Sequence, residues 1–293
     1  MDSKKINMKR VRDAIIWLTL IAGIAVVLFF AIHRKANAEI QGMEITIEAI
    51  NGKEYLISEK EVKQILQLAA GKSITKANIK TLNLRKLEAK LNKDKRIERA
   101  DLYFDSNDVL RVWVIQKKPV MRVKEISGSE YYIDQSGNQI PVTIGSAVRV
   151  PIITGVRDTF YSGIMQSNKP SRLKDVFQVM KYVFGDLFLS ALIEQAHIEA
   201  DDEQDIVLVP KVGREKVIFG DANNIEAKFD NLKIFYRDGM PKLGWSRYKT
   251  LNLKYSKQVL GMLANPEMAH RVMPVMKDSL TAEVTDNKQS IHN

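Results

Sequence analysis

An uncharged and almost wholly apolar run at residues 14–32 (AIIWLTLIAGIAVVLFFAI) constrains this chain more than any other feature. A helix of that length spans about 29 Å, which matches the hydrocarbon core of a bilayer. Five lysines and arginines precede the run, against two aspartates. Because basic residues stay on the cytoplasmic side, we expect a cytoplasmic tail (1–13), one transmembrane helix in contact with lipid (14–32), a linker (33–43) and about 260 residues outside.

A cleaved signal peptide is the alternative for the same segment. Ala36-Asn37-Ala38 resembles the small-residue motif that precedes a cleavage site. The apolar run is longer than the usual stretch of about 7–15 residues, however, and the basic stretch 33–35 separates it from the motif. Both features favour an uncleaved anchor. No second apolar stretch in the sequence is long enough to span a bilayer, so we expect a single pass.

Composition excludes several classes of protein. Among 293 residues, 45 are Lys or Arg and 35 are Asp or Glu, a net charge of +10, and the 45% hydrophobic content excludes a wholly disordered chain. The lack of cysteine excludes disulfides, thiol nucleophiles and cysteine-ligated metals, and the four histidines are widely scattered. The most basic window, 76–99, has no aromatic residue to stack on bases, so we expect no nucleic-acid partner.

Residues 44–118 are predicted to form one small domain with the element order β-α-α-β-β. Residues 44–48 alternate as in a half-buried strand, and Ser58 with Glu61 forms a capping box before an amphipathic helix that ends at Gly71. Apolar spacing predicts a second helix at about 77–92. Alternation then predicts two strands, around 100–104 and 110–114.

Residues 119–262 are predicted to form a mostly antiparallel β domain with flanking helices. Alternating segments joined by turn residues predict hairpins at about 131–142 and 206–219. Helical spacing of apolar residues predicts helices at about 171–192 and 225–236, and alternation at 251–255 predicts a terminal strand. Polar, weakly patterned residues 263–293 are predicted to be a mobile tail. The fold class is therefore α+β.

Several short motifs resemble catalytic or ligand-binding sequences but are incomplete. Lys72 and Ser73 resemble the end of a phosphate-binding loop, yet Leu66 stands where that loop needs a glycine. The S-x-x-K pattern of penicillin-binding acyltransferases occurs three times, at 73–76, 171–174 and 246–249, without the accompanying Lys-Thr-Gly. The acidic stretch 201–205 lacks the spacing of a calcium loop. We therefore expect no enzymatic activity, no cofactor, no metal and no small-molecule substrate.

Residues 44–118 resemble a POTRA domain, and the chain resembles the FtsQ/DivIB family of bacterial cell-division proteins. The segment QKKPVMR (116–122) resembles the family's signature after the last POTRA strand, with Gln116 in place of an acidic residue and Met121 in place of alanine. The segments YIDQSG (132–137) and VPIITG (150–155) match two further steps. YKTLNLKY (248–255) resembles the family's closing strand, with Asn252 in place of aspartate. The helix near 171–192 and Gly244-Trp245 resemble a Bacteroidetes-type branch.

This resemblance implies a non-catalytic scaffold of the divisome, anchored once in the inner membrane with its carboxyl terminus in the periplasm, at the septum. Such proteins bind the coiled-coil pair FtsB and FtsL and help link septum assembly to peptidoglycan synthesis. The alternative function is that of a POTRA-bearing transport, assembly or chaperone protein in the same membrane. That class usually carries several POTRA units or a β-barrel.

We predict that the partner binds by β-strand addition to the terminal strand, because a strand at a sheet edge has unpaired backbone groups. Lys254 and Lys257 suit an acidic partner, and Tyr255 is the expected aromatic anchor. The alternative is that Tyr255 only packs within the sheet. The predicted contact residues are Leu251, Asn252, Leu253, Lys254, Tyr255, Ser256, Lys257 and Val259.

Overall fold

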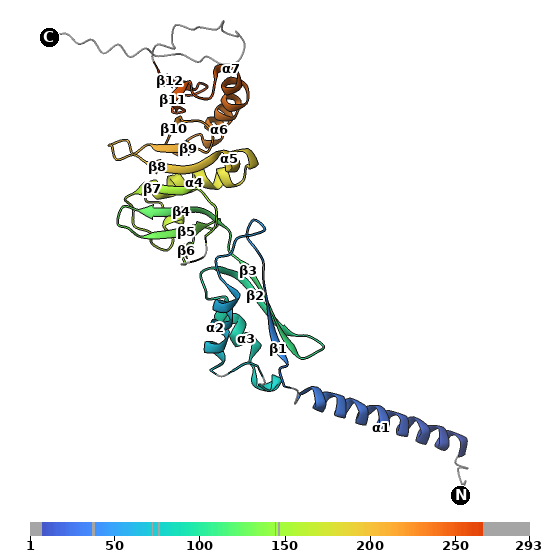
Figure 1. Cartoon of the computed structure of the whole chain (residues 1–293). Coiled ribbons are helices and arrows are strands. Elements are labelled where there is room, and N and C mark those ends of the chain that lie inside the picture. Colours follow the sequence, from blue (N-terminus) through green and yellow to red (C-terminus); the bar gives the residue numbers. More distant parts are fainter. Residues whose placement is uncertain are drawn as a thin grey trace, which may run out of the picture. The chain divides into compact units, whose positions relative to one another are not determined.

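The computed structural model describes residues 8–36, 39–71, 73–75, 77–143, 145 and 147–265. The chain divides into two compact units (Figure 1). Unit 1 comprises Met1–Glu48 and Ile57–Gln116, and unit 2 comprises Ala49–Leu56 and Lys117–Asn293. The tail predicted at 263–293 lies outside the described residues from 266 onward.

After helix α1, unit 1 contains a three-stranded sheet and the helices α2 and α3 in the predicted order β-α-α-β-β. The strands lie in the order β1-β3-β2, with β1 parallel and β2 antiparallel to the central β3. The predicted capping box of Ser58 and Glu61 begins α2, and Gly71 ends this helix in the left-handed conformation. The elements are β1 (Gly42–Ile47), α2 (Glu59–Ala70), η1 (Ile79–Thr81), α3 (Leu84–Leu91), β2 (Ile97–Phe104) and β3 (Val109–Gln116).

The second helix predicted in unit 1, at 77–92, is wrong in its extent, because the chain forms a 3-10 turn and then a shorter helix. The side chain of Asn78 accepts a hydrogen bond from the N–H of Lys80 and caps η1. Asn83 accepts one from the N–H of Lys86 and caps α3. Each asparagine satisfies the free N–H groups at the start of a helical segment, so the chain begins a helix twice.

Helix α1 (Met8–Ala36) precedes the sheet of unit 1. Its large apolar side chains between residues 15 and 29 are exposed. Within the described ranges, however, no helix is both long enough and apolar enough to cross a membrane, so the expected span at 14–32 receives no support there.

Unit 2 is built on a nine-stranded mixed sheet with the order β12-β11-β10-β9-β8-β7-β4-β5-β6. Neighbouring strands are antiparallel except for β4 with β7, β7 with β8, and β10 with β11, so the sheet is mostly antiparallel, as predicted. The strands are β4 (Pro119–Glu125), β5 (Glu130–Asp134), β6 (Gln139–Pro141), β7 (Ile152–Val156), β8 (Ile193–Ile198), β9 (Ile206–Pro210), β10 (Lys216–Gly220), β11 (Tyr248–Asn252) and β12 (Leu260–Leu263).

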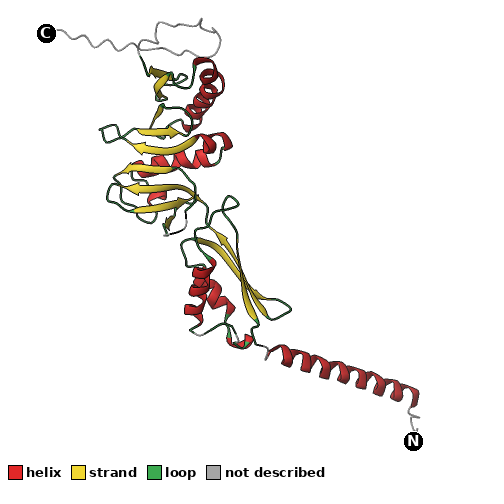
Figure 2. Cartoon of the chain, viewed as in Figure 1, coloured by secondary structure: helices red, strands yellow, loops and turns green. Residues whose placement is uncertain are grey.

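Helices cover one face of the unit 2 sheet (Figure 2). The prediction of a single helix at 171–192 is wrong, because the first helix ends at Gly185 and the side chain of Asp186 caps a second one. Aromatic side chains of the sheet and of the helices pack together in the core: the ring centroids of Phe219 on the sheet and Phe229 on a covering helix are 4.8 Å apart. The helical elements are η2 (Ile164–Gln166), α4 (Arg172–Phe184), α5 (Leu187–Leu192), α6 (Ile225–Ile234), the π-helical η3 (Phe235–Gly239) and α7 (Met240–Leu243).

Residues 49–56 belong to unit 2 although they lie between β1 and α2 in the sequence. Ile50 and Leu56 are buried in a small apolar cluster with Tyr132, Ile140 and Val148. The hydroxyl of Tyr132 accepts a hydrogen bond from the N–H of Val148 at 3.2 Å. The segment therefore packs on the part of the sheet formed by β5 and β6.

Candidate partner-binding site

The predicted contact segment begins in β11, which is not the edge of the sheet. Strand β11 pairs in parallel with β10 and in antiparallel with β12. The expectation that the strand at 251–255 lies at the edge is therefore wrong. In the described part of the chain, the outermost strand on this side is β12. Strand β12 was not predicted, because its four residues, Leu-Gly-Met-Leu, are too few to show a strand pattern.

The eight predicted contact residues divide into buried and exposed groups. Leu251, Leu253 and Val259 are buried in the main core of unit 2, and Asn252 is half-buried. The N–H of Leu253 continues the pairing with β10 by donating to the carbonyl of Ile218 at 2.9 Å. The exposed members lie in the loop between β11 and β12, and they are Lys254, Tyr255, Ser256 and Lys257.

Tyr255 is 51% exposed, so its side chain is not buried within the sheet. Two residues later, Lys257 has φ of +61°, a left-handed conformation that turns the chain back toward β12. Neither residue has a hydrogen-bond or ion-pair partner within the described residues. The loop therefore offers an aromatic ring and a free cation beside the outermost strand.

Lys254 differs from Lys257 because it is held by carboxylates of its own chain. Its Nζ lies 2.9 Å from Asp205 Oδ2 and also contacts Glu203. Hydrogen bonds to Glu203 and to Asp205 raise the pKa of Lys254 above its ordinary value. The prediction that Lys254 is available to pair with an acidic partner is therefore wrong, because carboxylates of its own chain already neutralise it.

The same ion pairs give the acidic stretch 201–205 a structural role. The aliphatic stem of Lys254 crosses Gly220, where an added Cβ would lie 2.8 Å from Lys254 Cγ. Glu203 and Asp205 neutralise the ammonium at the end of that stem. Within the described ranges, no group of three or more acidic or histidine side chains is arranged to hold a metal ion.

Strand β12 lies tightly against β11 because residue 261 is glycine. An added Cβ at Gly261 would lie 2.4 Å from the ring of Tyr248, closer than such contacts occur. The Tyr248 ring is buried and packs edge-on against Phe235, with centroids 5.5 Å apart. Pairing continues beyond the strand, where the N–H of Ala264 donates to the carbonyl of Arg247 at 2.9 Å.

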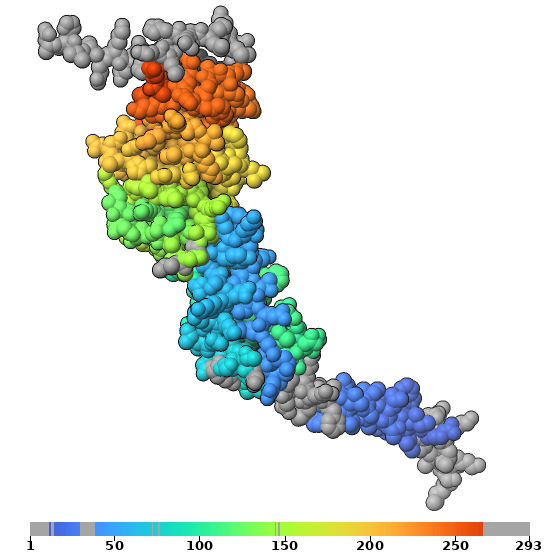
Figure 3. Space-filling model, viewed as in Figure 1, coloured from blue at the N-terminus to red at the C-terminus, as the bar shows by residue number. Residues whose placement is uncertain are grey.

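Sequence reasoning missed Met262, which points outward from β12 and is 55% exposed. Its exposure follows from register, because Gly261 faces Tyr248 and the next side chain of a strand faces the opposite side. The segment 248–263, coloured orange to red, lies at the surface of unit 2 (Figure 3). The candidate site is therefore the loop 254–257 together with β12.

One of the incomplete catalytic motifs is used to begin a helix. Ser171 Oγ caps α4 by accepting a hydrogen bond from the N–H of Lys174, and it donates one to Asp158 at 2.7 Å. Among the described residues, the contacts of this hydroxyl are those of a helix cap, with the backbone N–H of Lys174 and the carboxylate of Asp158. Lys76 of another of these motifs lies outside the described residues.

Comparison with protein families agrees with the division into two units. A family model described as a POTRA-like domain matches residues 39–115, and one described as FtsQ/DivIB, C-terminal related, matches residues 118–261. A search of curated proteins returned no match. The fold and these matches define a POTRA-containing protein with a large, mostly sheet domain after the POTRA-like unit. The chain belongs to the FtsQ/DivIB family.

Proposed function

We propose that this chain is a non-catalytic scaffold of the bacterial divisome that binds FtsB/FtsL-type coiled-coil proteins by β-strand addition. Membership of the FtsQ/DivIB family supports a role in cell division. The observation that carries the binding mode is the position of β12, which has a strand neighbour on one side only within the described residues. Such a strand has a free row of backbone donors and acceptors.

The opposite edge of the same sheet is less suited to accept a strand. That edge is β6, which has three residues and ends in Pro141. Proline has no N–H to donate, and a short edge strand offers few hydrogen bonds. Strand β12 contains no proline and is flanked by the exposed loop 254–257. These differences favour β12 as the acceptor edge.

Side chains beside β12 supply specificity in this proposal. Tyr255 and Met262 are half exposed and offer apolar contact area next to the backbone of the edge strand. Lys257 is a cation without a carboxylate partner in the described part of the chain, so it favours an acidic residue on the incoming segment. Lys254 holds the start of this loop in place through its ion pairs with Glu203 and Asp205.

We also propose that residues 14–32 anchor the chain in the inner membrane, with the amino terminus cytoplasmic and unit 2 periplasmic at the septum. The uncharged run, its basic flank and the exposed apolar side chains of α1 support this. The chain has no cysteine, so a cysteine introduced at Ser3 or at Ser162, an exposed residue of unit 2 outside the candidate site, is unique. A membrane-impermeant maleimide should label Ser162→Cys in intact cells and label Ser3→Cys only after lysis. Equal labelling of both before lysis would contradict this topology.

The partner is tested by placing a photo-crosslinking amino acid at Tyr255 or Met262 of the full chain in its own cells. We expect an adduct with a small coiled-coil division protein, identified by mass spectrometry. Tyr161 is a matched control, because it is an aromatic residue of unit 2 that is 47% exposed and lies outside the candidate site. The proposal fails if Tyr255 and Met262 yield no more of that adduct than Tyr161.

The identity of the adduct separates the scaffold from its alternative. The second candidate is a POTRA-bearing transport, assembly or chaperone protein, with which the match to a POTRA-like domain is also consistent. Adducts with an outer-membrane or secretion component would support it and overturn the division role. Adducts with division proteins from Arg85 of unit 1, and none from β12, would retain the scaffold and move its binding site.

A further inference from the structure

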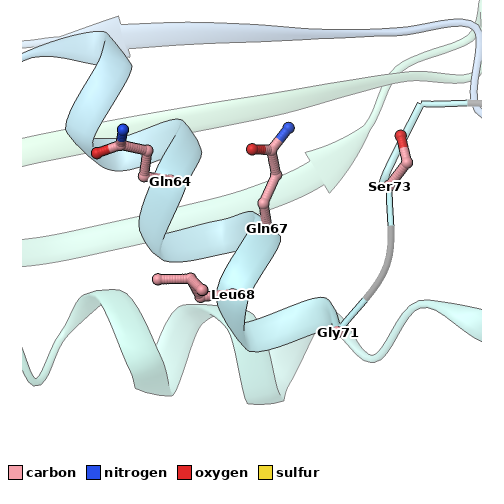
Figure 4. Close-up of a pocket in the computed structure, with 5 residues that line it drawn as sticks. All are labelled: Gln64, Gln67, Leu68, Gly71 and Ser73. Carbon is pink, nitrogen blue, oxygen red and sulfur yellow. The ribbon is translucent and has the colours of Figure 1, made fainter.

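Unit 1 has two open hollows beside helix α2, and one leucine, Leu68, lines both of them. The first has a volume of about 690 Å³ and lies along the end of α2 (Figure 4). The second, between the two helices, has a volume of about 510 Å³. We call the two together the α2–α3 groove. Its lining residues are Gln64, Ile65, Gln67, Leu68, Ala69, Gly71, Ser73, Lys86, Ala89, Lys90 and Lys93.

Leu68 is 81% exposed, although it lies on a helix whose core positions are filled. Val62 and Leu66 of the same helix are fully buried against the sheet, so Leu68 is not needed for the core of unit 1. The side chains beside it in the second hollow include the small residues Ala69 and Ala89. An exposed leucine next to a hollow with small walls leaves room for an apolar side chain of another molecule.

The rim of the second hollow carries only positive charge. Lys86, Lys90 and Lys93 are spaced by four and then three residues, which places them in one stripe along α3 and its end. The stripe is roughly 10 Å long at the rise of a helix. None of the three amines pairs with a carboxylate within the described residues.

The carboxylates nearest in sequence are already engaged elsewhere in unit 1. Glu88 of α3 accepts a hydrogen bond from the N–H of Leu102 at 2.9 Å, on the sheet. Glu61 and Asp94 both pair with Arg96. Among the residues that the structure describes, no carboxylate pairs with this basic stripe, so its three charges can pair with an external partner.

We propose that the α2–α3 groove binds an acidic amphipathic helix of a partner protein. Such a helix would place an apolar side chain beside Leu68 and carboxylates at helical spacing against Lys86, Lys90 and Lys93. The hollows favour a protein helix over an anionic membrane, because concave walls add nothing to contact with lipid headgroups. Binding of single-stranded nucleic acid is disfavoured because none of the described residues that line the groove is aromatic. This site is separate from β12 and from the proposed binding of a coiled coil there.

The test uses a synthetic peptide of about 20 residues, held helical by a side-chain staple, with leucines in one stripe and glutamates at i, i+4 and i+7 on its flank. Binding of the fluorescent peptide to the full chain is measured by anisotropy. A scrambled peptide of the same composition is the first control. Vesicles of anionic phosphatidylglycerol are a second ligand, tested with the same variants.

Two variants test the two parts of the groove. Replacing Lys86, Lys90 and Lys93 by glutamine should weaken peptide binding about tenfold and remove most of its dependence on salt. Leu68→Ser should weaken binding by a similar factor, and the fold should survive because Leu68 is outside the core. In a matched charge control, Lys53, Lys60 and Lys63 are replaced by glutamine. These three lysines are exposed but do not line the groove, so their replacement should leave binding unchanged.

Three results would overturn the proposal. The first is a scrambled peptide that binds as tightly as the amphipathic one. The second is equal loss of binding in the groove variant and the matched charge control, which would indicate attraction to net charge alone. The third is binding of the anionic vesicles, but not of the peptide, that depends on Lys86, Lys90 and Lys93, which would assign the groove to a membrane surface.

Discussion

Replacing Gly261 by alanine should detach or destabilise β12, the strand on which the proposed function depends. The new Cβ would lie 2.4 Å and 2.5 Å from two carbons of the Tyr248 ring. Tyr248 cannot swing outward freely, because it is 4% exposed and packs against Phe235. Either the ring or the strand must shift by about 1 Å to restore an ordinary contact. Overpacking of this kind costs about 1–3 kcal/mol.

The cost is measured as the change in the free energy of unfolding of unit 2, followed by tryptophan fluorescence in urea. Hydrogen exchange then shows whether strand β12 has separated, since its amides would lose protection before the rest of the sheet. Gly185→Ala is the matched control within unit 2, because the nearest atom to its added Cβ is the carbonyl oxygen of Tyr182 at 3.5 Å, an ordinary contact. We expect that control to change stability by less than about 0.5 kcal/mol. A Gly261→Ala protein with the parent's stability and the parent's exchange in β12 would refute this account of the edge.

Two further predictions concern stability. Burial is the largest single influence on Glu61 and Asp94 and raises the pKa of each. The hydrogen bonds and charge of Arg96, joined at Glu61 by hydrogen bonds from Ser58, together bring the two pKa values below 4.5 and 3.8. The two carboxylates therefore stabilise unit 1 at pH values above their unfolded-state pKa values, and this stabilisation is lost as the pH falls through their folded-state pKa values. Arg96→Gln should destabilise unit 1 by about 2 kcal/mol near neutral pH and by less near about pH 3, as measured by urea unfolding. Gly155 has φ of +78°, and its added Cβ would lie 2.2 Å from the carbonyl oxygen of Ile198. Gly155→Ala should therefore cost roughly 3 kcal/mol or more on thermal unfolding, and a loss below about 1 kcal/mol would contradict the close pairing of β7 with β8.

Features that depend on near neighbours in the sequence were predictable. The capping box of Ser58 and Glu61, the stop at Gly71 and the alternation around 110–114 all act within a few residues, and the structure has each of them. The helix breaks at Asn83 and Asp186 are also local signals, since both residue types prefer caps. The apolar spacing continues through both breaks, however, so it predicted one uninterrupted helix at each place.

The candidate site depends on contacts between distant residues, which spacing alone does not reveal. Lys254 meets carboxylates about fifty residues earlier in the chain, and no local pattern pairs it with Glu203 or Asp205. Strand β12 has only four residues, Leu-Gly-Met-Leu, which show no polar–apolar alternation, so no separate strand was predicted there. Its place at the edge depends on the fit of Gly261 against Tyr248, a contact made only once β11 is in the sheet. Which strand is the edge is therefore a property of the folded unit.

Hydrogen exchange of the full chain, with and without a segment of the FtsB/FtsL-type protein proposed as its partner, tests strand addition at β12 most directly. A partner strand forms new backbone hydrogen bonds, so amides of Leu260–Leu263 should exchange at least about tenfold more slowly in the complex. Residues of the α2–α3 groove should be unaffected by this partner. If the partner binds and exchange in β12 stays unchanged, strand addition at this edge is wrong.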